Sequence, residues 1–327
     1  MKKRILSGMR PTGPLHIGHL FGALENWIKL QESYECLFMV ADWHALMSEY
    51  ENPTAIHDNI IEMVIDWVSC GLDIDKCTIF IQSRVPEHLE LAMILSNITP
   101  LSWLERNPTY KEQLREMTTR NLTTYGFLGY PILQAADILL YKAGTVPVGE
   151  DQLAHLELTR EIVRKFNGLY KGKVLIEPHP LLAKTPRILG LDNRKMSKSY
   201  GNYIALKDDP DTIKKKVGSM VTDPKRVKKS DKGHPEVCTL HDYFGIFKPS
   251  IKKEVEGWCK KAEKGCTECK AVLASVISDY FGPMRKKRET LAKDKGEISR
   301  ILDRGNEKAR LIAKDTITQV KKTVGIL

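Results

Sequence analysis

The strongest constraint on this fold is the alternation of short apolar runs with helical patterns over the first two hundred residues. The apolar runs have the length of buried strands, and the longer segments between them repeat apolar residues at helical spacing. The strand-like runs span residues 3–7, 36–41 and 78–82, the helical patterns span 16–31, 56–68, 130–141 and 151–166, and 144–149 is a short apolar connection. Alternation of this kind predicts a parallel sheet with right-handed crossovers. We therefore expect an α/β, Rossmann-like domain over residues 1–206.

The last third of the chain has a different pattern and a different charge. Strand-like runs are missing there, and helical spacing appears at residues 211–220, 251–260, 270–280 and 305–324. Residues 1–206 carry 22 basic and 23 acidic side chains, whereas residues 207–327 carry 29 and 18. We expect a basic α-helical domain over residues 207–327, with its last helix packed back onto the first domain. Nucleic acid is one explanation of the charge, and a solvated lysine-rich surface is the other.

Apolar runs and cysteine usage bear on the cellular compartment. No run is long enough to span a bilayer, and the segment after Arg4 is too short and polar for a signal-peptide core. We expect a cytoplasmic protein without a membrane segment. Seven cysteines in such a chain argue against a disulfide framework. Three of them, Cys36, Cys70 and Cys77, are expected to be small core residues.

The other four cysteines crowd into the basic domain. They have the form C-x20-C-x6-C-x2-C, at Cys238, Cys259, Cys266 and Cys269. Two thiolates at C-x2-C spacing can reach one metal ion, so the set predicts a closed tetrathiolate site. The spacing fits both zinc and a 4Fe–4S cluster. A chance group of buried free thiols is the alternative.

A second feature is His16-Ile17-Gly18-His19, which follows the first strand and a Pro-Thr-Gly turn and opens a helix. A helix N-terminus attracts phosphate, and both imidazoles can donate to phosphate oxygens. Gly18 leaves room for a nucleotide beside the backbone. About 180 residues later, the polar segment KMSKS at residues 195–199 offers two lysines that can follow a triphosphate. Each motif alone also fits an ordinary surface segment.

A third feature lies on the helix predicted at 130–141. Its spacing places Tyr130, Gln134 and Asp137 on one face. A carboxylate on an otherwise apolar face needs a partner. Asp137 could accept a hydrogen bond from an indole N–H or a phenol O–H, or pair with a neighbouring arginine or with backbone amides.

A HIGH-type sequence followed by KMSKS is the signature pair of class I aminoacyl-tRNA synthetases, and this chain resembles that superfamily. The segments YPILQAADILLY, VPVGEDQ, HLELTRE and RKFN, from residue 130 to residue 167, are similar to those of the tryptophanyl-tRNA synthetases. The resemblance covers nearly the whole chain. It implies a tryptophan–tRNA ligase that forms tryptophanyl-adenylate from L-tryptophan and ATP and then charges tRNA(Trp). It also implies Mg²⁺ with ATP, a homodimer, and an anticodon-binding role for the helical domain.

The resemblance also implies site residues. Those that match ATP- or pyrophosphate-contacting positions are Arg10, Thr12, His16, Gly18, His19, Lys111, Gly149, Asp151, Lys195, Met196, Ser197 and Lys198. Four of these, His16, His19, Lys195 and Lys198, are the implied catalytic residues. Those that match the tryptophan pocket are Leu6, Gly8, Tyr130, Gln134, Asp137, Val146, Val148 and Gln152. In the family the aspartate at the position of Asp137 accepts the indole N–H.

Three departures from the family pattern stand out. Many bacterial relatives have Phe where this chain has Leu6. Many also have Met where this chain has Gln134, and glutamine is the residue that the tyrosyl enzymes have at this position. Some bacterial members hold a 4Fe–4S cluster with C-x22-C-x6-C-x2-C. The last two gaps agree here, while the first is two residues shorter. The resemblance therefore favours an iron–sulfur cluster over zinc at the four cysteines.

Three alternative functions remain open. A tyrosine–tRNA ligase shares the fold and a similar Tyr–Gln–Asp helix. A nucleotidyltransferase of the HxGH type shares the first motif, but KMSKS and the basic domain argue against it. A non-catalytic RNA-binding relative would not need the intact HIGH-type and KMSKS motifs.

Overall fold

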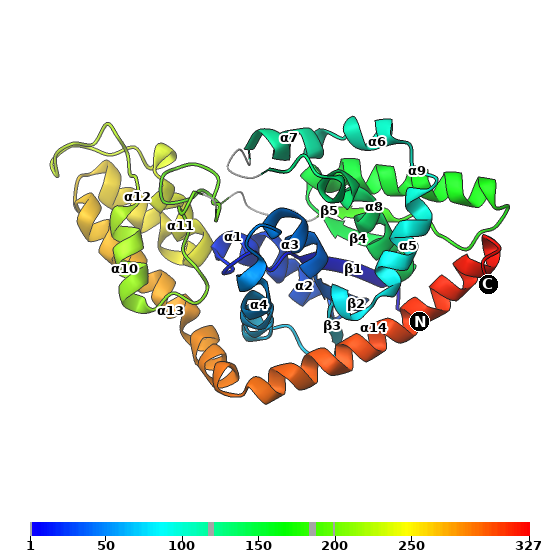
Figure 1. Cartoon of the computed structure of the whole chain (residues 1–327). Coiled ribbons are helices and arrows are strands. Elements are labelled where there is room, and N and C mark those ends of the chain that lie inside the picture. The colour runs from blue at the N-terminus through cyan, green and yellow to red at the C-terminus, as the bar shows by residue number, and fades with distance from the viewer. Residues whose placement is uncertain (1, 117–120, 183–187, 199) are drawn as a thin grey trace. The chain divides into compact units, whose positions relative to one another are not determined.

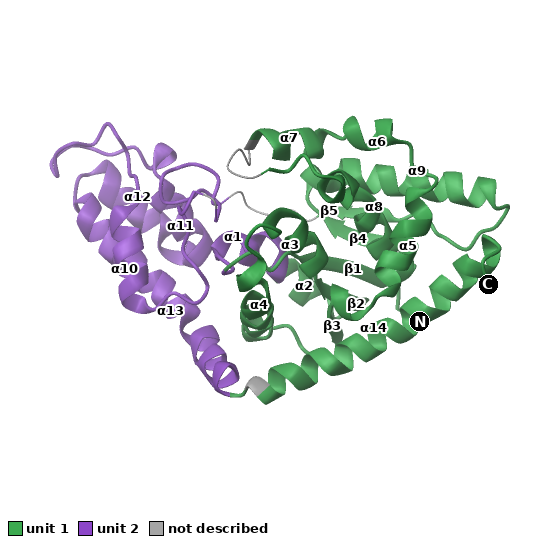
Figure 2. Cartoon of the chain, in the orientation of Figure 1, with its two compact units in different colours: residues 1–13, 25–184, 294–327 green, residues 14–24, 185–293 purple. Residues whose placement is uncertain are grey.

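A computed structural model describes residues 2–116, 121–182, 188–198 and 200–327. The chain forms two compact units (Figure 2). Unit 1 comprises Met1–Gly13, Glu25–Lys184 and Asp294–Leu327, and unit 2 comprises Pro14–Leu24 and Thr185–Lys293. The boundaries of these units differ from a single boundary at residue 206. Pro14–Leu24 belongs to unit 2, and Asp294–Leu327 belongs to unit 1.

Unit 1 is built on a parallel sheet (Figure 1). Within the described residues its order is β3-β2-β1-β4-β5, with every pairing parallel. The strands are β1 (Arg4–Met9), β2 (Glu35–Val40), β3 (Cys77–Ile81), β4 (Thr145–Val148) and β5 (His179–Leu182). The predicted α/β class is confirmed. The segment expected to be a connection, 144–149, forms β4 instead, because its Val-Pro-Val core pairs with β1 on one side and β5 on the other.

Helices surround this sheet. They are α2 (Glu25–Leu30), α3 (Asp42–Glu49), α4 (Ile56–Cys70), α5 (Glu87–Ser96), α6 (Leu101–Glu105), α7 (Pro108–Glu116), α8 (Tyr125–Leu140), α9 (Leu153–Leu169) and α14 (Lys295–Thr323). Two single 3₁₀ turns, η3 (Gln82–Arg84) and η4 (Glu150–Gln152), follow β3 and β4. Leu37, Phe80, Leu139 and Phe166 are fully buried in one core that joins the strands to these helices.

Helix α14 packs on the edge strand of the sheet, as the sequence predicted for the last helix. Gly305 lies so close to the carbonyl of Ile79 in β3 that a Cβ atom would collide with it. The next residue, Asn306, accepts a hydrogen bond at Oδ1 from the backbone N–H of Ile81 (2.8 Å). Arg310 Nε also donates to Glu87 of α5 (3.1 Å). A side chain therefore satisfies an edge amide that a further strand would otherwise pair.

Unit 2 is mainly helical. Its elements are α1 (Ile17–His19), a π-helical turn η1 (Leu20–Leu24), α10 (Pro210–Ser219), α11 (Thr239–Phe247), α12 (Lys252–Lys260) and α13 (Cys266–Lys293). Aromatic rings form its centre, with Phe21 and Phe247 edge-on at 5.4 Å between ring centroids. Helices α10, α12 and α13 confirm three of the predicted helical segments. No helix among the residues that the structure describes is long and apolar enough to cross a membrane.

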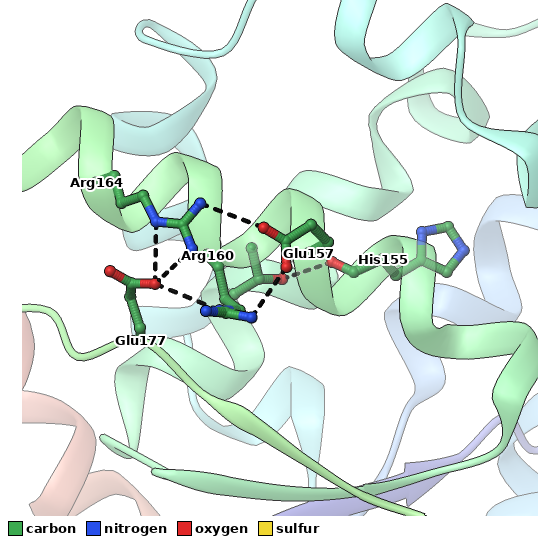
Figure 3. A network of polar contacts seen from close by, with 6 residues as sticks. His155, Glu157, Arg160, Arg164 and Glu177 are labelled. Carbon is green, nitrogen blue, oxygen red and sulfur yellow. Dashed lines mark hydrogen bonds and ion pairs between the residues drawn. The ribbon is translucent and has the colours of Figure 1, made fainter.

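An ion-pair network lies on the outer face of α9 (Figure 3). Arg164 donates to Glu177 from Nη2 (2.8 Å) and to Glu157 from Nη1 (3.2 Å). Arg160 donates to the same two carboxylates, at 3.3 Å and 3.0 Å. Glu177 precedes β5 in the sequence, so the network ties the approach to the edge strand to α9. His155, labelled in the same view, accepts a hydrogen bond at its backbone carbonyl from Thr159 Oγ1 (2.9 Å).

Candidate active site

The centre of the candidate site in unit 1 is Asp137 on α8. The side chain of Thr124 caps this helix by accepting from the backbone N–H of Phe127 (3.2 Å). Asp137 is only 2% exposed. Its Oδ1 accepts from Gln82 Nε2 (2.8 Å) and His88 Nδ1 (2.6 Å), and its Oδ2 accepts from His44 Nε2 (2.8 Å). The arginine and backbone partners considered from sequence are not the ones used.

These hydrogen bonds keep Asp137 charged. Burial alone raises the pKa of a carboxyl group, but the hydrogen bonds from His44 and His88 outweigh it and bring the pKa of Asp137 to about 2. His88 Nε2 in turn accepts from the hydroxyl of Tyr141 (2.8 Å). Burial, and then the charge of Asp137, raises the pKa of Tyr141 far above its usual value, so this hydroxyl keeps its proton. The result is an ionised acceptor held in place by three hydrogen-bond donors.

Sequence reasoning missed the partners of Asp137. His44 lies on α3 after β2, Gln82 opens the turn after β3, and His88 lies on α5. Two of the three thus follow the carboxyl end of a parallel strand, which is where ligands bind in sheets of this kind. That position, rather than any local motif, is the signal that could have found them.

A second set of hydrogen bonds holds the side chain of Tyr130. Asn107 Nδ2 donates to His155 Nδ1 (3.0 Å), so the other ring nitrogen of His155 carries the proton and donates to Tyr130 Oη (2.9 Å). Burial, and then the charge of His44, lowers the pKa of His155 to about 4. Burial raises the pKa of Tyr130. Both groups are therefore neutral near pH 7, and the hydroxyl hydrogen of Tyr130 remains available as a donor.

The other predicted tryptophan residues lie along the same helix and strands. Gln134 Nε2 donates to Gln152 Oε1 (3.3 Å), and Gln152 Nε2 donates to Asp151 Oδ2 (2.8 Å). Leu6 and Gly8 lie on β1, and Val146 and Val148 lie on the neighbouring strand β4. The strand order reverses at this pair, so the predicted pocket residues meet at the topological switch point, the usual place for a ligand.

Gly8 holds a close approach between two strands. A Cβ atom on Gly8 would lie 2.6 Å from the carbonyl oxygen of Met39 on β2, so a larger residue would push these strands apart. A Cβ atom on Gly149 would meet only the carboxylate of the exposed side chain of Asp151, which can move away.

The HIGH-type turn belongs to unit 2 and is held by its own side chains. His16 is the N-cap of α1: its Nδ1 accepts from the backbone N–H of Gly18 (3.1 Å), while His19 Nδ1 accepts from the N–H of His16 (3.1 Å). Each ring therefore carries its proton on Nε2. These amides are already bonded within the turn, so the imidazole Nε2–H groups, rather than the amides of His16 and Gly18, are the donors suited to phosphate. A Cβ atom on Gly18 would lie 2.9 Å from the ring of His16, which explains the glycine.

Both histidines of this turn are neutral. Burial, and then the charge of Lys198, lowers the pKa of His16 to about 4. Burial, His16 and Lys198, in that order, lower the pKa of His19 further below its usual value. A Cβ atom on Gly18 would lie 3.7 Å from Met196 Sδ, so the KMSKS segment lies beside the HIGH-type turn.

Backbone pairing brings these two motifs together. His16 and Ala205 form an antiparallel bridge, Ile17 N–H donates to the carbonyl of Ile204 (3.1 Å), and Leu206 N–H donates to that of Leu15 (2.9 Å). Residues separated by 187 to 191 positions in the sequence thus become neighbours within unit 2.

Asn202 organises the KMSKS loop. It is 4% exposed, its Nδ2 donates to the carbonyl of Lys195 (3.1 Å) and to Asp192 Oδ1 (2.7 Å), and its Oδ1 accepts from the N–H of Ser197 (2.8 Å). Met196 is buried, whereas Lys195 is exposed and Lys198 half-buried. The last residue of the motif, Ser199, lies outside the described residues. Asn202 is a further residue that the sequence reasoning did not identify.

The remaining predicted ATP residues lie in unit 1. Arg10 and Thr12 follow β1, and the N–H of Thr12 donates to the carbonyl of Arg10 (2.9 Å). Thr12 lines a polar cavity of about 370 Å³ whose other walls include Ser48 and Asn52. Lys111 is exposed on α7, and Gly149 and Asp151 follow β4. The predicted ATP residues thus divide between the two units.

The four cysteines of unit 2 are described, and each is half-buried. Burial, and then Cys238, Cys259 and Cys266, raises the pKa of Cys269 to about 12, so the four thiols affect one another electrostatically. However, no group of three or more His, Cys, Asp or Glu side chains in the described part of the chain is arranged to hold a metal ion. The predicted tetrathiolate site is therefore not confirmed.

Arg226 lies in the basic segment at residues 225–229 and makes structural hydrogen bonds beside these thiols. Arg226 Nη2 donates to the carbonyls of Lys229 (2.9 Å) and Lys264 (2.8 Å), and its Nη1 lies 4.0 Å from Cys259 Sγ. Gly233 packs against the same sulfur so closely that a Cβ atom would collide with it. Arg226 thus joins the 225–229 loop to the cysteine segment.

Comparison with known proteins identifies relatives along the whole chain. Residues 1–282 match the model of a family described as tRNA synthetases class I (W and Y). The tryptophan–tRNA ligase of Thermotoga maritima is 46% identical over 329 residues, covering 99% of both chains. That of Aquifex aeolicus is 41% identical over 394 residues, covering 99% of this chain and 100% of its own. The crystal structure of the Campylobacter jejuni tryptophanyl-tRNA synthetase complexed with ADP and tryptophan has a TM-score of 0.91 at 33% identity, covering 98% of this chain and 99% of its own.

Proposed function

The chain belongs to the class I tRNA synthetase family of the tryptophan and tyrosine enzymes, and we propose from this that its substrate is tryptophan. It is an ATP-dependent aminoacyl-tRNA ligase. It activates L-tryptophan with ATP to tryptophanyl-adenylate and pyrophosphate, and then transfers the amino acid to the 3′ end of tRNA(Trp). The observation that carries this conclusion is the 46% identity to a tryptophan–tRNA ligase over essentially the full length of both chains.

Amino-acid recognition is proposed for unit 1. Asp137 is an ionised, buried acceptor that suits the indole N–H, and Leu6, Gly8, Val146 and Val148 supply the apolar strand positions around it. Gln152 and Tyr130 are proposed to hold the polar end of the amino acid. Gln134, the tyrosyl-type residue at its position, is bonded to Gln152. Its amide is thereby directed to the polar end, which supports tryptophan despite the residue type.

The chemical step is proposed to need no covalent enzyme intermediate. The tryptophan carboxylate attacks the α-phosphorus of ATP, a new P–O bond forms, and the bond to the bridging oxygen of pyrophosphate breaks. His16 and His19, both neutral with Nε2–H donors, and Lys195 and Lys198 stabilise the charge on the phosphoryl oxygens. Mg²⁺ bound with ATP neutralises phosphate charge when present.

Further ATP contacts are proposed for positions in both units. They are Arg10, Thr12, Gly18, Lys111, Gly149, Asp151, Met196 and Ser197. Residues 1–206 are proposed as the catalytic domain and residues 207–327 as the anticodon-binding domain, which carries the excess positive charge.

The experiment that tests this function is ATP–pyrophosphate exchange with tryptophan and tyrosine in parallel assays. Exchange with tryptophan alone is expected. Exchange with tyrosine alone would keep the mechanism but overturn the substrate. No exchange with either amino acid, in a folded protein, would favour a non-catalytic RNA-binding role.

We propose a 4Fe–4S cluster, rather than zinc, at Cys238, Cys259, Cys266 and Cys269. The support is the agreement of the last two spacings with an iron–sulfur motif of related enzymes and the electrostatic proximity of the four thiols. When bound, the cluster would cross-link the segments that carry these cysteines. Anaerobic purification is expected to give a brown protein with about four iron atoms per cluster. A colourless protein that contains zinc would contradict the proposal.

A homodimer and a cytoplasmic location complete the proposal. Leu89 and Met93 are exposed one turn apart on α5, and Leu101 is exposed at the start of α6. Exposed apolar side chains that gather on neighbouring helices are typical of a protein–protein interface. Sedimentation equilibrium would show a mass of twice 37.2 kDa, and Met93→Glu is expected to shift it toward the monomer. The cytoplasm is proposed as the compartment in which the tRNA substrate is used.

A further inference from the structure

Gln82 is the partner of Asp137 that the proposed mechanism leaves without a role of its own. It opens the turn η3 after β3, and its side chain is fully buried, at 0% exposure. Its Nε2 donates to Asp137 Oδ1 (2.8 Å). Its Oε1 is also buried and has no hydrogen-bond partner among residues 2–116, 121–182, 188–198 and 200–327. A buried acceptor without a partner is costly and rare in native proteins, so it calls for an explanation.

The orientation of this amide follows from its neighbour. If the amide were flipped, Oε1 would face the carboxylate oxygen of Asp137, and two acceptors would oppose each other. Only the observed orientation of the Gln82 amide lets Gln82 donate to Asp137. The structure around Asp137 therefore forces the Gln82 oxygen to remain without a protein partner.

Asp137 itself has little capacity left. A carboxylate offers about four acceptor positions, and three are taken by Gln82, His88 and His44. Gln82 Oε1 belongs to the same amide as the nitrogen that contacts Asp137, so it lies beside that carboxylate with its acceptor capacity unused. Asp137, which is nearly saturated, therefore has beside it a second buried acceptor that has no partner among the described residues.

We propose that Gln82 is a specificity-determining residue whose Oε1 accepts the indole N–H of the substrate together with Asp137. The inference rests on the proposed function and assigns a second acceptor within it. Substrate binding then satisfies both buried acceptors at once. An amino acid of the same shape without the N–H leaves the Gln82 oxygen unpaired, and a site built to hydrogen-bond a donor rejects such an analogue strongly.

The test compares two amino acids of nearly the same shape in the full-length protein. L-Tryptophan donates through its indole N–H, whereas its benzothiophene isostere has sulfur at that position and no donor. For Gln82→Met, kcat/KM in ATP–pyrophosphate exchange is expected to fall about 10- to 100-fold for tryptophan and to change little for the isostere. The ratio of kcat/KM for tryptophan to kcat/KM for the isostere should therefore fall by about the same factor.

Gln31 provides a matched control in the same unit. It is 3% exposed, its Nε2 donates to the carbonyl of Gly71 (3.2 Å), and its Oε1 accepts from the N–H of Asp73 (2.9 Å). Both ends of this buried amide are satisfied by the protein. Gln31→Met removes a buried amide of the same size, and the tryptophan-to-isostere ratio should stay at the value of the unchanged protein.

Several outcomes would overturn the proposal. An equal loss for both amino acids in Gln82→Met would mean a merely structural role, and an unchanged kcat/KM for tryptophan would mean no role in recognition. In a protein that already carries Asp137→Asn, a further fall in the tryptophan-to-isostere ratio on adding Gln82→Met supports direct contact between Gln82 and the indole N–H. If Gln82→Met changed nothing there, Gln82 would act only through Asp137, which contradicts the proposal.

Two controls keep the result interpretable. If Gln82→Met does not fold, as judged by circular dichroism, Gln82→Asn keeps the amide but withdraws it by one methylene, and the same fall in the ratio is expected. Failure of the proposed function has a different signature, because the unsubstituted protein would then show no exchange with tryptophan at all.

Discussion

Asp137 in unit 1 and His16 in unit 2 are both buried ionisable side chains, yet one keeps its charge and the other loses it. Three donors surround Asp137, and its pKa falls to about 2. The ring of His16 instead accepts a hydrogen bond from a backbone N–H and lies near Lys198, and its pKa falls to about 4. Burial penalises the charged form in both places. At Asp137 the hydrogen bonds from His44 and His88 outweigh burial, whereas at His16 burial is the larger cause and the charge of Lys198 adds to it.

This difference matches the two tasks proposed for the units. Recognition of an N–H group needs an acceptor whose charge and position do not change, and unit 1 encloses one. Contact with phosphate needs donors, and unit 2 supplies neutral imidazole N–H groups next to lysines that are less buried. The comparison predicts that removal of charge in unit 1 affects selectivity, whereas removal of charge in unit 2 affects rate.

The largest effect is expected from Asp137→Ala. It removes the charged acceptor and leaves the donors of Gln82, His44 and His88 without their common partner. We expect kcat/KM for tryptophan to fall by about 10⁴-fold or more in ATP–pyrophosphate exchange. Asp223 is a matched control, because it is 3% exposed and also accepts from a histidine, His234 (2.8 Å). Asp223→Ala should lower stability without this loss, and an unchanged kcat/KM in Asp137→Ala would refute its role.

The next effect is expected from Lys198→Ala. Loss of one charged donor aimed at the transition state typically costs about 10²–10³ in rate. We expect kcat for adenylate formation to fall by that factor while KM for tryptophan stays within about threefold, because unit 1 is untouched. Lys253, exposed on α12, is the control, and Lys253→Ala should retain full kcat. A rise in the tryptophan KM with kcat unchanged would reverse the assignment of the two units.

A smaller effect concerns the pH dependence of stability. The pKa of His155 is about 4 in the folded protein against 6.5 in the unfolded chain, so the unfolded chain binds more protons between these values. The folded state therefore loses stability as pH falls from 6.5 toward 4, by about 3 kcal/mol in total. His155→Gln should flatten this slope in urea unfolding at pH 7, 6 and 5. His57→Gln, at an exposed position, should leave the slope unchanged, and equal slopes in all three proteins would mean that His155 is not held neutral.

The smallest effect is expected at the α9 network of Figure 3. Arg164 and Glu177 are paired at the surface, where ion pairs contribute little. Arg164→Ala is expected to lower Tm by less than about 4 °C and to leave exchange activity unchanged. A large loss of activity would show that the outer face of α9 communicates with His155 on the same helix.

The sequence predicted one half of the sheet, strands β1, β2 and β3, but predicted neither β4 nor β5 as a strand. Strands β1, β2 and β3 are apolar runs that local pattern detects, whereas β5 begins with His-Pro and is largely exposed, so it lacks a buried-strand pattern. Helices α3, α5, α6, α7 and α11 were not predicted. Helix α6 is only five residues long, and helix α7 carries four charged side chains in nine residues.

Local sequence pattern also predicted only part of the candidate site. The predicted acceptor, Asp137, was visible because a single carboxylate interrupts an apolar helix face. Its partners His44, Gln82 and His88 come from three separate elements, and only the order of the strands brings them to one carboxylate. No local sequence pattern predicts that these three side chains converge on Asp137, or that Asn202 holds the KMSKS loop.

The close packing of α14 on β3 has a consequence for the order of folding during synthesis. The backbone amide of Ile81 finds its partner in Asn306, which the ribosome adds 225 positions later. Until then β3 is an uncovered sheet edge, open to pairing with another nascent chain. The unit that is begun first is thus completed last, after the whole of unit 2 has been translated. A stop codon in place of the codon for Asp294 would leave every residue of unit 2 in place, yet we expect aggregation of the shortened product through this edge.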